Sequence, residues 1–200
     1  MSTPRRTHAV LALAVVQGFL GMGFQLVASR LLSPYFGTTL IVWAFLISVF
    51  LAAFSLGAFV GGIVSQLDSR RRRIGVAVLA IAGTAWFAFV ALAGWAVVGA
   101  IEQTFEALWL AVCIACVLLF LLPVAALSAL LPIYTDLVEQ GGRGAGISSG
   151  LVFGTSTFGN IVGVIVTAFV LIPNFPTSEL LVGWWLCAFA CFAGAYRIAR

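Results

Sequence analysis

Six long apolar runs, separated by short polar segments, restrict this chain to a fold embedded in a membrane. The runs cover residues 9–28, 40–65, 74–98, 107–131, 147–172 and 180–196. A helix needs about 20 residues to cross a hydrocarbon core about 30 Å thick, and each run comes close to that length or exceeds it. A helix also satisfies its backbone hydrogen bonds internally, as lipid requires. The sequence therefore predicts an all-α membrane protein, a six-transmembrane-helix bundle that forms a single domain over residues 1–200.

The arginines are distributed unevenly along this pattern. The chain has ten basic residues, all arginine. If the N-terminus is cytoplasmic, nine of them lie on the inner side: Arg5, Arg6, Arg70, Arg71, Arg72, Arg73, Arg143, Arg197 and Arg200. Only Arg30 lies on the outer side. Basic residues in short loops favour the cytoplasmic face, so we expect a bacterial inner-membrane protein with both termini in the cytoplasm.

Motifs typical of enzymes are missing. The chain has no nucleotide-binding loop, no H-E-x-x-H and no G-x-S-x-G, and its single histidine, His8, lies in the N-terminal tail. A Ser-His-Asp triad or a histidine metal site cannot be assembled from these residues. Arg70–Arg73 is interpreted as a topology signal at anionic headgroups, because no basic soluble domain accompanies it. We expect no catalytic residue, no cofactor, no metal and no nucleic-acid partner.

Four cysteines fall in two spans. Cys113 and Cys116 belong to the fourth span, and Cys187 and Cys191 to the sixth. Both pairs would lie in the outer half of the membrane, so a site with four thiolate ligands for zinc is geometrically conceivable. Buried cysteine more often acts as a small apolar residue. Packing is therefore the favoured interpretation, with zinc or disulfide chemistry as the alternative.

A polar stripe follows the fifth apolar run. Ser149, Ser156, Asn160 and Thr167 fall within roughly 40° of one another on a helix that turns about 100° per residue. Glycines four residues apart flank this stripe on two sides and recur in the second run, and such spacing lets helix backbones approach closely. The predicted packing residues are Gly57, Gly61, Gly150, Gly154, Gly159 and Gly163. Two packing sides predict a central fifth span, and its stripe either bonds to neighbouring helices or lines a substrate path.

The first apolar run carries a second polar face. An arc of about 120° on the helix is shared by Gln17, Gly18, Gly21, Gln25 and Ser29. The two glutamines are amides at membrane depth, and such groups need partners. Arg30 follows Gln25 by little more than one turn. As the only outer arginine, Arg30 is either a ligand-binding residue or an anchor that reaches the outer headgroups.

Several of these segments resemble a known family. Residues 25–37, QLVASRLLSPYFG, and the glycine steps at 56–57 and 61–62 resemble the start of the membrane domain of bacterial spermidine-synthase-like multi-pass proteins, the fused transporter/spermidine synthases. Residues 142–146, 157–163 and 169–173 are similar to that family's fifth span. The resemblance covers nearly the whole chain. It implies a transporter-like module, and the family name suggests polyamines as substrates.

The chain departs from the family in three ways. The family typically has glutamate where this chain has Gln25, and often an acid where this chain has Gln66. The aminopropyltransferase-like domain that many members carry after the spans is missing. Any synthase would therefore be a separate subunit.

Two function classes follow from these features. The first is a half-transporter-like module that handles a small polar metabolite, since six spans resemble half of a carrier of the major-facilitator type. The second is a non-transporting anchor for a separate aminopropyltransferase-like or methyltransferase-fold enzyme. The expected partners are the lipid bilayer, a second copy or a soluble synthase-like subunit, and a small molecule.

For the transporter class, the sequence predicts a polar substrate pocket that opens outward. Its expected lining is Gln17, Gln25, Arg30, Ser156 and Asn160. This set has no carboxylate, so it suits a neutral, zwitterionic or anionic solute better than a polyamine. The competing interpretation is direct hydrogen bonding between packed helices, with no cavity.

Overall fold

The computed structural model describes residues 3–199, with side chains from Arg6 onward, and these residues form helices and no strand. Three spans are single helices at the start of the chain: α1 (Thr3–Phe36), α2 (Leu40–Ser65) and α3 (Ser69–Thr104). The fourth span comprises α4 (Leu108–Cys116), η1 (Val117–Leu121), α5 (Leu122–Ser128) and α6 (Leu130–Glu139). The fifth comprises α7 (Ala145–Val166), η2 (Thr167–Leu171) and α8 (Ile172–Asn174), and the sixth is α9 (Thr177–Ile198). All six are long and apolar enough to cross a membrane, so the predicted all-α six-helix bundle is confirmed.

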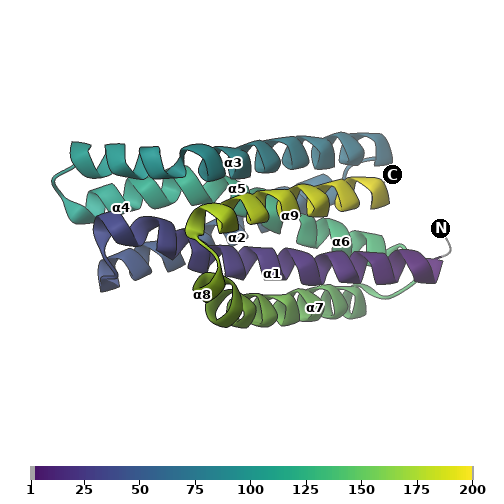
Figure 1. Cartoon of the computed structure of the whole chain (residues 1–200). Helices are drawn as coiled ribbons and strands as arrows, with labels where there is room; N and C mark the ends of the chain where they lie inside the picture. Colours follow the sequence, from purple (N-terminus) through teal and green to yellow (C-terminus); the bar gives the residue numbers. More distant parts are fainter. Residues whose placement is uncertain (1–2, 200) are drawn as a thin grey trace.

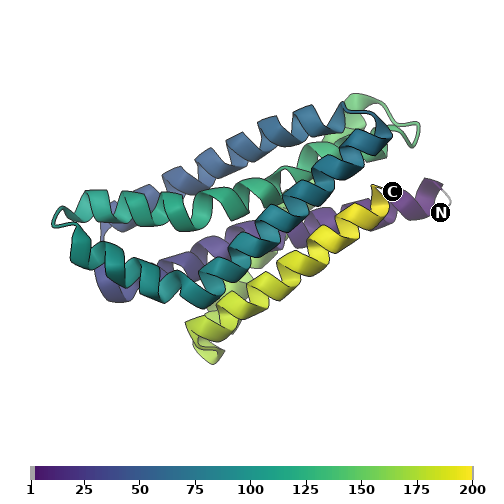
Figure 2. The same cartoon turned by 90° about the horizontal axis from the view of Figure 1, so that it is seen from above.

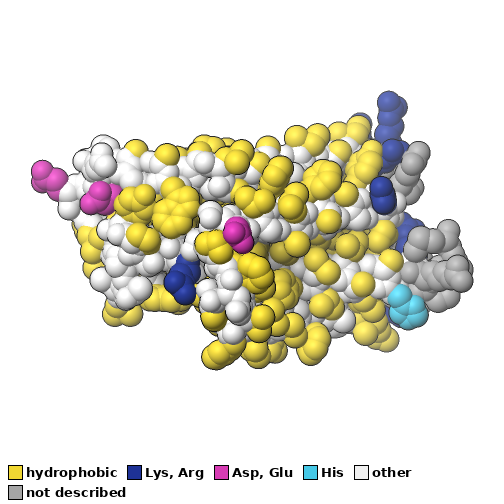
Figure 3. Space-filling model, in the orientation of Figure 1, with side chains coloured by type: hydrophobic (Ala, Val, Ile, Leu, Met, Phe, Trp, Pro, Cys, Tyr) yellow, Lys and Arg dark blue, Asp and Glu magenta, His cyan; other side chains and the backbone are white. Residues whose placement is uncertain are grey.

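Both described ends of the chain lie at one end of the bundle (Figure 1). The connections at residues 66–68 and 140–144 lie at this same end, which we call the terminal end, and the other three connections lie at the distal end. On the face shown in Figure 3, hydrophobic side chains cover the length of the bundle and most basic side chains gather at the terminal end. Two arginines of the predicted inner set, the Arg5 side chain and Arg200, lie outside the described residues.

The helices extend beyond the predicted apolar runs. α1 continues from residue 28 to Phe36, through Arg30, and α3 covers Ser69–Thr104 where the run covers only 74–98. Backbone hydrogen bonding does not stop where the hydrocarbon stops, because the headgroup regions widen a bilayer to about 40–45 Å. The 36 residues of α3 make a helix about 54 Å long. The runs therefore located the apolar part of each helix and missed its ends.

The first span lies at the centre of the bundle. α1 contacts helices of all five other spans, and in Figures 1 and 2 it runs between them. In its most apolar stretch 56% of the residues are buried, compared with 22% in the fifth span. The prediction of a central fifth span is therefore wrong. α7 lies at the periphery and packs mainly against α1 and α6.

Aromatic rings from four spans fill the core around α1. The ring of Phe24 lies 4.9 Å from that of Phe87 and 5.7 Å from that of Phe120, both in edge-on geometry. Phe50 of α2 completes the cluster at 6.0 Å from Phe120. Edge-on pairs add about 0.5–1.5 kcal/mol each beyond the burial of their area. This cluster fixes α1 against α2, α3 and η1.

The fourth and fifth spans each contain a π-helical turn just before a proline. Val117–Leu121 precedes Pro123, and Thr167–Leu171 precedes Pro173. A proline ring lacks an N–H and clashes with the carbonyl four residues earlier. A locally widened turn relieves that clash, and such turns occur often at functional sites. Pro123 and Pro173 thus set where these two spans depart from regular helix.

Candidate functional site

The most extensive helix contact in the bundle is the seam between α1 and α7. A methyl group on Gly159 would overlap the carbonyl oxygen of Val15, and one on Gly163 would lie 2.5 Å from the carbonyl oxygen of Phe19. These approaches are between backbones, which cannot move aside as a side chain can. The predicted packing role of Gly159 and Gly163 is therefore visible in the geometry of the seam.

Two predicted site residues meet inside this seam. The Ser156 hydroxyl donates a hydrogen bond of 3.0 Å to Oε1 of Gln17. Gln17 is 3% exposed and Ser156 is 4% exposed. The neighbouring Gly18 lies directly against the Ser156 carbonyl, so the helices leave no space at this level. At these two residues the geometry is that of a direct bond between packed helices.

The other three predicted site residues, Gln25, Asn160 and Arg30, do not contact one another through hydrogen bonds among the described residues. Gln25 is 9% exposed, and its side chain makes no hydrogen bond within the part of the chain that the structure describes. Asn160, one turn beyond Ser156, is half-buried, and its side chain also has no partner among the described residues. Arg30 is exposed and points roughly 140° away from Gln25 around α1. The structure therefore does not bring all five residues into one pocket.

A small cavity that sequence reasoning missed lies at the distal end between α1 and α9. Its volume is about 360 Å³, and its lining includes Leu20, Trp184 and, as the one acidic residue, Glu179. The Trp184 indole donates a hydrogen bond of 3.0 Å to the Leu20 carbonyl. Beside this ring lies the fully buried Thr167, whose hydroxyl has no partner among the described residues. The available sequence signals were Glu179 in the first turn of α9 and Thr167 at membrane depth.

Gly150 and Gly154 require a correction. No atom lies within 4 Å of the methyl group that either would carry as alanine, and both are exposed. Neither glycine therefore lies at a close approach to another helix in the part of the chain that the structure describes. In the second span, methyl groups on Gly57 and Gly61 would overlap the carbonyls of Ala125 and Ala129, so both lie at a close approach between helices.

An ion pair joins α3 to α6 at the terminal end of the bundle. Arg72 and Asp136 form it at 2.5 Å, and the Gln140 amide donates to the same carboxylate oxygen at 2.7 Å. Arg72 is buried, whereas Arg70 and Arg71 are exposed. Sequence reasoning treated the four arginines as equivalent. The signal that separates them is helical phase, because Arg72 lies one turn before the buried Val76.

The four cysteines lie in α4 of the fourth span and in α9 of the sixth. Cys116 and Cys191 are buried in the apolar core, and Cys187 is exposed. Among residues 3–199 all four are free thiols, and no three acidic, cysteine or histidine side chains are placed to hold a metal ion. Burial among apolar side chains fits the packing interpretation for Cys116 and Cys191.

Comparison of the chain with protein-family models, curated proteins and solved structures finds no match.

Proposed function

We propose that this protein is a transporter-type module of the bacterial inner membrane, with both termini in the cytoplasm, that helps to move a small polar solute. The observation that carries the proposal is Gln25 of the central helix, which is 9% exposed and unpartnered within the described residues. An unsatisfied polar group in a bilayer costs several kcal/mol. A helix that only anchors a chain gains nothing from such a residue, whereas a solute path needs one.

The chemistry around Gln25 limits the solute. An amide offers donors and an acceptor but no charge, which favours a neutral, zwitterionic or anionic molecule over a bare polycation. Aromatic rings fill the core around Phe24, so one bundle alone leaves little room for a path. We therefore propose that two copies, or one copy and another six-helix unit, enclose the path between them.

Replacing Gln25 with leucine tests this proposal. Gln25→Leu removes an amide that has no hydrogen-bond partner among the described residues, so the variant should be as stable as the wild type or more stable. Gln17→Leu is the matched comparison, because it breaks the bond to Ser156 and should lower stability. Thermal-shift screening of small neutral, zwitterionic and anionic metabolites, with spermidine alongside, selects a solute, and its uptake into proteoliposomes measures flux.

The expected result is that Gln25→Leu lowers flux at least tenfold while its melting temperature does not fall. Unchanged flux in this variant, in an assay where the wild type is active, would refute a path through Gln25. Preference for spermidine over neutral and zwitterionic solutes would refute the proposed solute class.

A second candidate function, a membrane anchor for a soluble enzyme, draws on the terminal end. The Arg72–Asp136 pair holds the ends of α3 and α6 together, and Arg70, Arg71 and Arg143 are exposed around them. Such a rigid basic surface suits an acidic protein partner. Specific co-purification of one cytosolic enzyme, lost in Arg70→Gln/Arg71→Gln, would favour this function over transport.

A further inference from the structure

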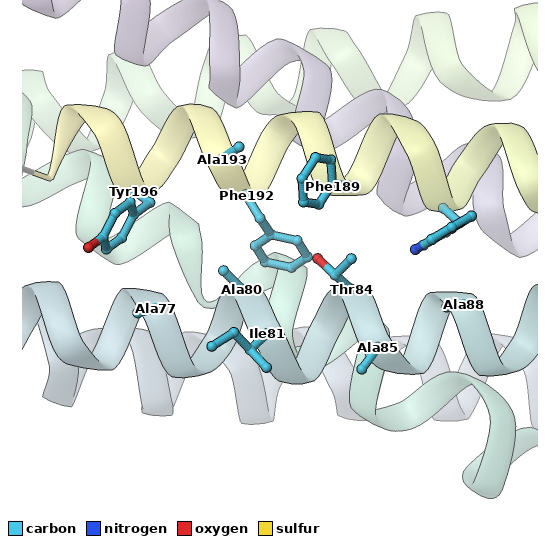
Figure 4. A pocket seen from close by; sticks show the side chains of 11 residues that line it. Ala77, Ala80, Ile81, Thr84, Ala85, Ala88, Phe189, Phe192, Ala193 and Tyr196 are labelled. Carbon is cyan, nitrogen blue, oxygen red and sulfur yellow. The ribbon is translucent and has the colours of Figure 1, made fainter.

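A groove of about 600 Å³ runs between α3 and α9 and opens to the outside of the bundle (Figure 4). Figure 2 shows these two helices side by side toward the terminal end. α3 contributes mainly small side chains and α9 mainly large rings, and this mismatch leaves the hollow. Phe192 forms the floor: it is 1% exposed, and its ring lies 2.6 Å from the methyl group that alanine would carry at Gly83. Ile81 and Phe189, 71% and 58% exposed, form the outer walls.

The dimensions of the groove fit a hydrocarbon chain. Its lining on α3 extends from Ala77 to Ala88, which is about 17 Å along a helix. One leaflet contributes about 15 Å to the hydrocarbon core. The length of the groove therefore matches one acyl chain in a single leaflet.

A cation lies at the terminal end of this groove. Tyr196 lines that end (Figure 4), and Arg73 lies over its ring with Cζ 5.1 Å from the ring centroid. Nε of Arg73 donates a hydrogen bond of 3.0 Å to the Tyr196 hydroxyl. Stacking and this bond hold the guanidinium in place and leave its two terminal nitrogens without a partner among the described residues.

Within residues 6–199, no carboxylate lies within 4.0 Å of the Arg73 guanidinium. The single ion pair among residues 6–199 is that of Arg72 with Asp136. Residues 68–73 contain four arginines and one aspartate, so their formal charge is +3. Arg70 lies one turn before Arg73 on the same side of α3. A planar guanidinium binds a phosphate through two parallel hydrogen bonds, which completes a site with an apolar groove at one side and a phosphate-binding group at its end.

We propose that this groove binds an anionic phospholipid from the leaflet at the terminal end. One acyl chain lies between α3 and α9 over Phe192, and the phosphate binds Arg73 where it stacks on Tyr196. The lipid then covers apolar walls that the chain itself leaves exposed. This site is separate from Gln25 and does not depend on the proposed solute path.

Native mass spectrometry of the full chain, purified in mild detergent and mixed with phosphatidylglycerol and phosphatidylcholine of identical acyl chains, tests the proposal. The wild type should retain one phosphatidylglycerol per chain, about tenfold more tightly than phosphatidylcholine. Arg73→Gln should abolish this preference. Arg71→Gln is the matched control, because it removes the same charge from the opposite side of α3 and should keep the preference.

A second pair of variants tests the groove independently of charge. Ala80→Leu places a larger side chain in the groove and should reduce retention of both lipids at least tenfold. Ala82→Leu, on an exposed part of α3 outside the groove, should leave the retention of both lipids unchanged. If Arg71→Gln and Arg73→Gln reduced the preference for phosphatidylglycerol equally, the proposal would be overturned. Non-specific electrostatic attraction between the arginines and the lipid would then explain the binding. Full lipid retention by Ala80→Leu, or conversion of a dimer to a monomer by it, would overturn it as well.

Discussion

The hydrogen bond between Ser156 and Gln17 joins two helices whose backbones are already in contact. Its donor and acceptor are almost completely buried, so neither can turn to water if the other is lost. In membrane proteins such bonds contribute about 0.6 kcal/mol on average and up to about 1.7 kcal/mol. The pair therefore helps to determine which faces of α1 and α7 meet more than it stabilises their contact.

Ser156→Ala should lower the free energy of unfolding by about 1 kcal/mol, because it leaves the Gln17 amide without its donor. Thr155→Ala is the control, since the Thr155 hydroxyl donates within its own helix to the Leu151 carbonyl at 2.8 Å. We expect that variant to stay within about 0.5 kcal/mol of the wild type. Unfolding titrations in mixed micelles with SDS measure both. An equal loss in the two variants would contradict a specific bond between helices.

At this scale the sequence predicted which polar residues lie at membrane depth but not how they pair. Gln17 and Ser156 were both recognised from helical phase, yet Gln17 could equally have met Asn160, one turn along the same face. Arg72 and Asp136 lie 64 residues apart, and neither residue's neighbours indicate the other. Pairing depends on which helices meet and in what register, and a single sequence does not contain that information locally.

At the scale of the element, small residues define the seam between α1 and α7. Gly150, Gly154, Gly159 and Gly163 share one helix and the same spacing, but only Gly159 and Gly163 face another helix. Spacing shows that a close approach is sterically possible on a given side. It does not show whether a neighbour occupies that side, and for this reason the prediction held for one pair and failed for the other.

Gly159→Leu should separate α1 from α7, because the new side chain would overlap the Val15 carbonyl. Overpacking against a backbone that cannot move should cost about 3 kcal/mol or more. Gly150→Leu is the matched control on the same helix, with open space around it, and should be neutral or slightly stabilising. Melting temperatures in detergent distinguish the two variants. Similar destabilisation by both would mean that the helix faces are assigned incorrectly.

At the scale of the whole molecule, the number of spans follows from composition, whereas the centre of the bundle does not. Each apolar run is a local property, so six helices could be counted from the sequence. Every run is apolar on most of its circumference, however, and lipid does not distinguish a buried apolar face from an exposed one. The central position of α1 results from its contacts with five other spans, which no single run reveals.

The orientation proposed from the arginines can be tested by cysteine labelling. In a background with the four natural cysteines replaced by alanine, Ser178→Cys at the distal end should react with a membrane-impermeant maleimide in intact cells. Gln66→Cys at the terminal end should react only after permeabilisation, because the positive-inside rule places that end in the cytoplasm. Reaction of Gln66→Cys from outside would reverse or refute the proposed orientation.

The central position of α1 has a consequence for the order of events during synthesis. α1 leaves the ribosome before the other five spans, and Ser156 follows Gln17 by 139 residues. At about 5–20 residues per second, roughly 7 to 28 seconds pass before that partner exists. During this interval Gln17, on the helix around which the others assemble, lacks the partner that it has in the folded bundle. The surroundings of α1 are therefore completed only after the fifth and sixth spans have been made.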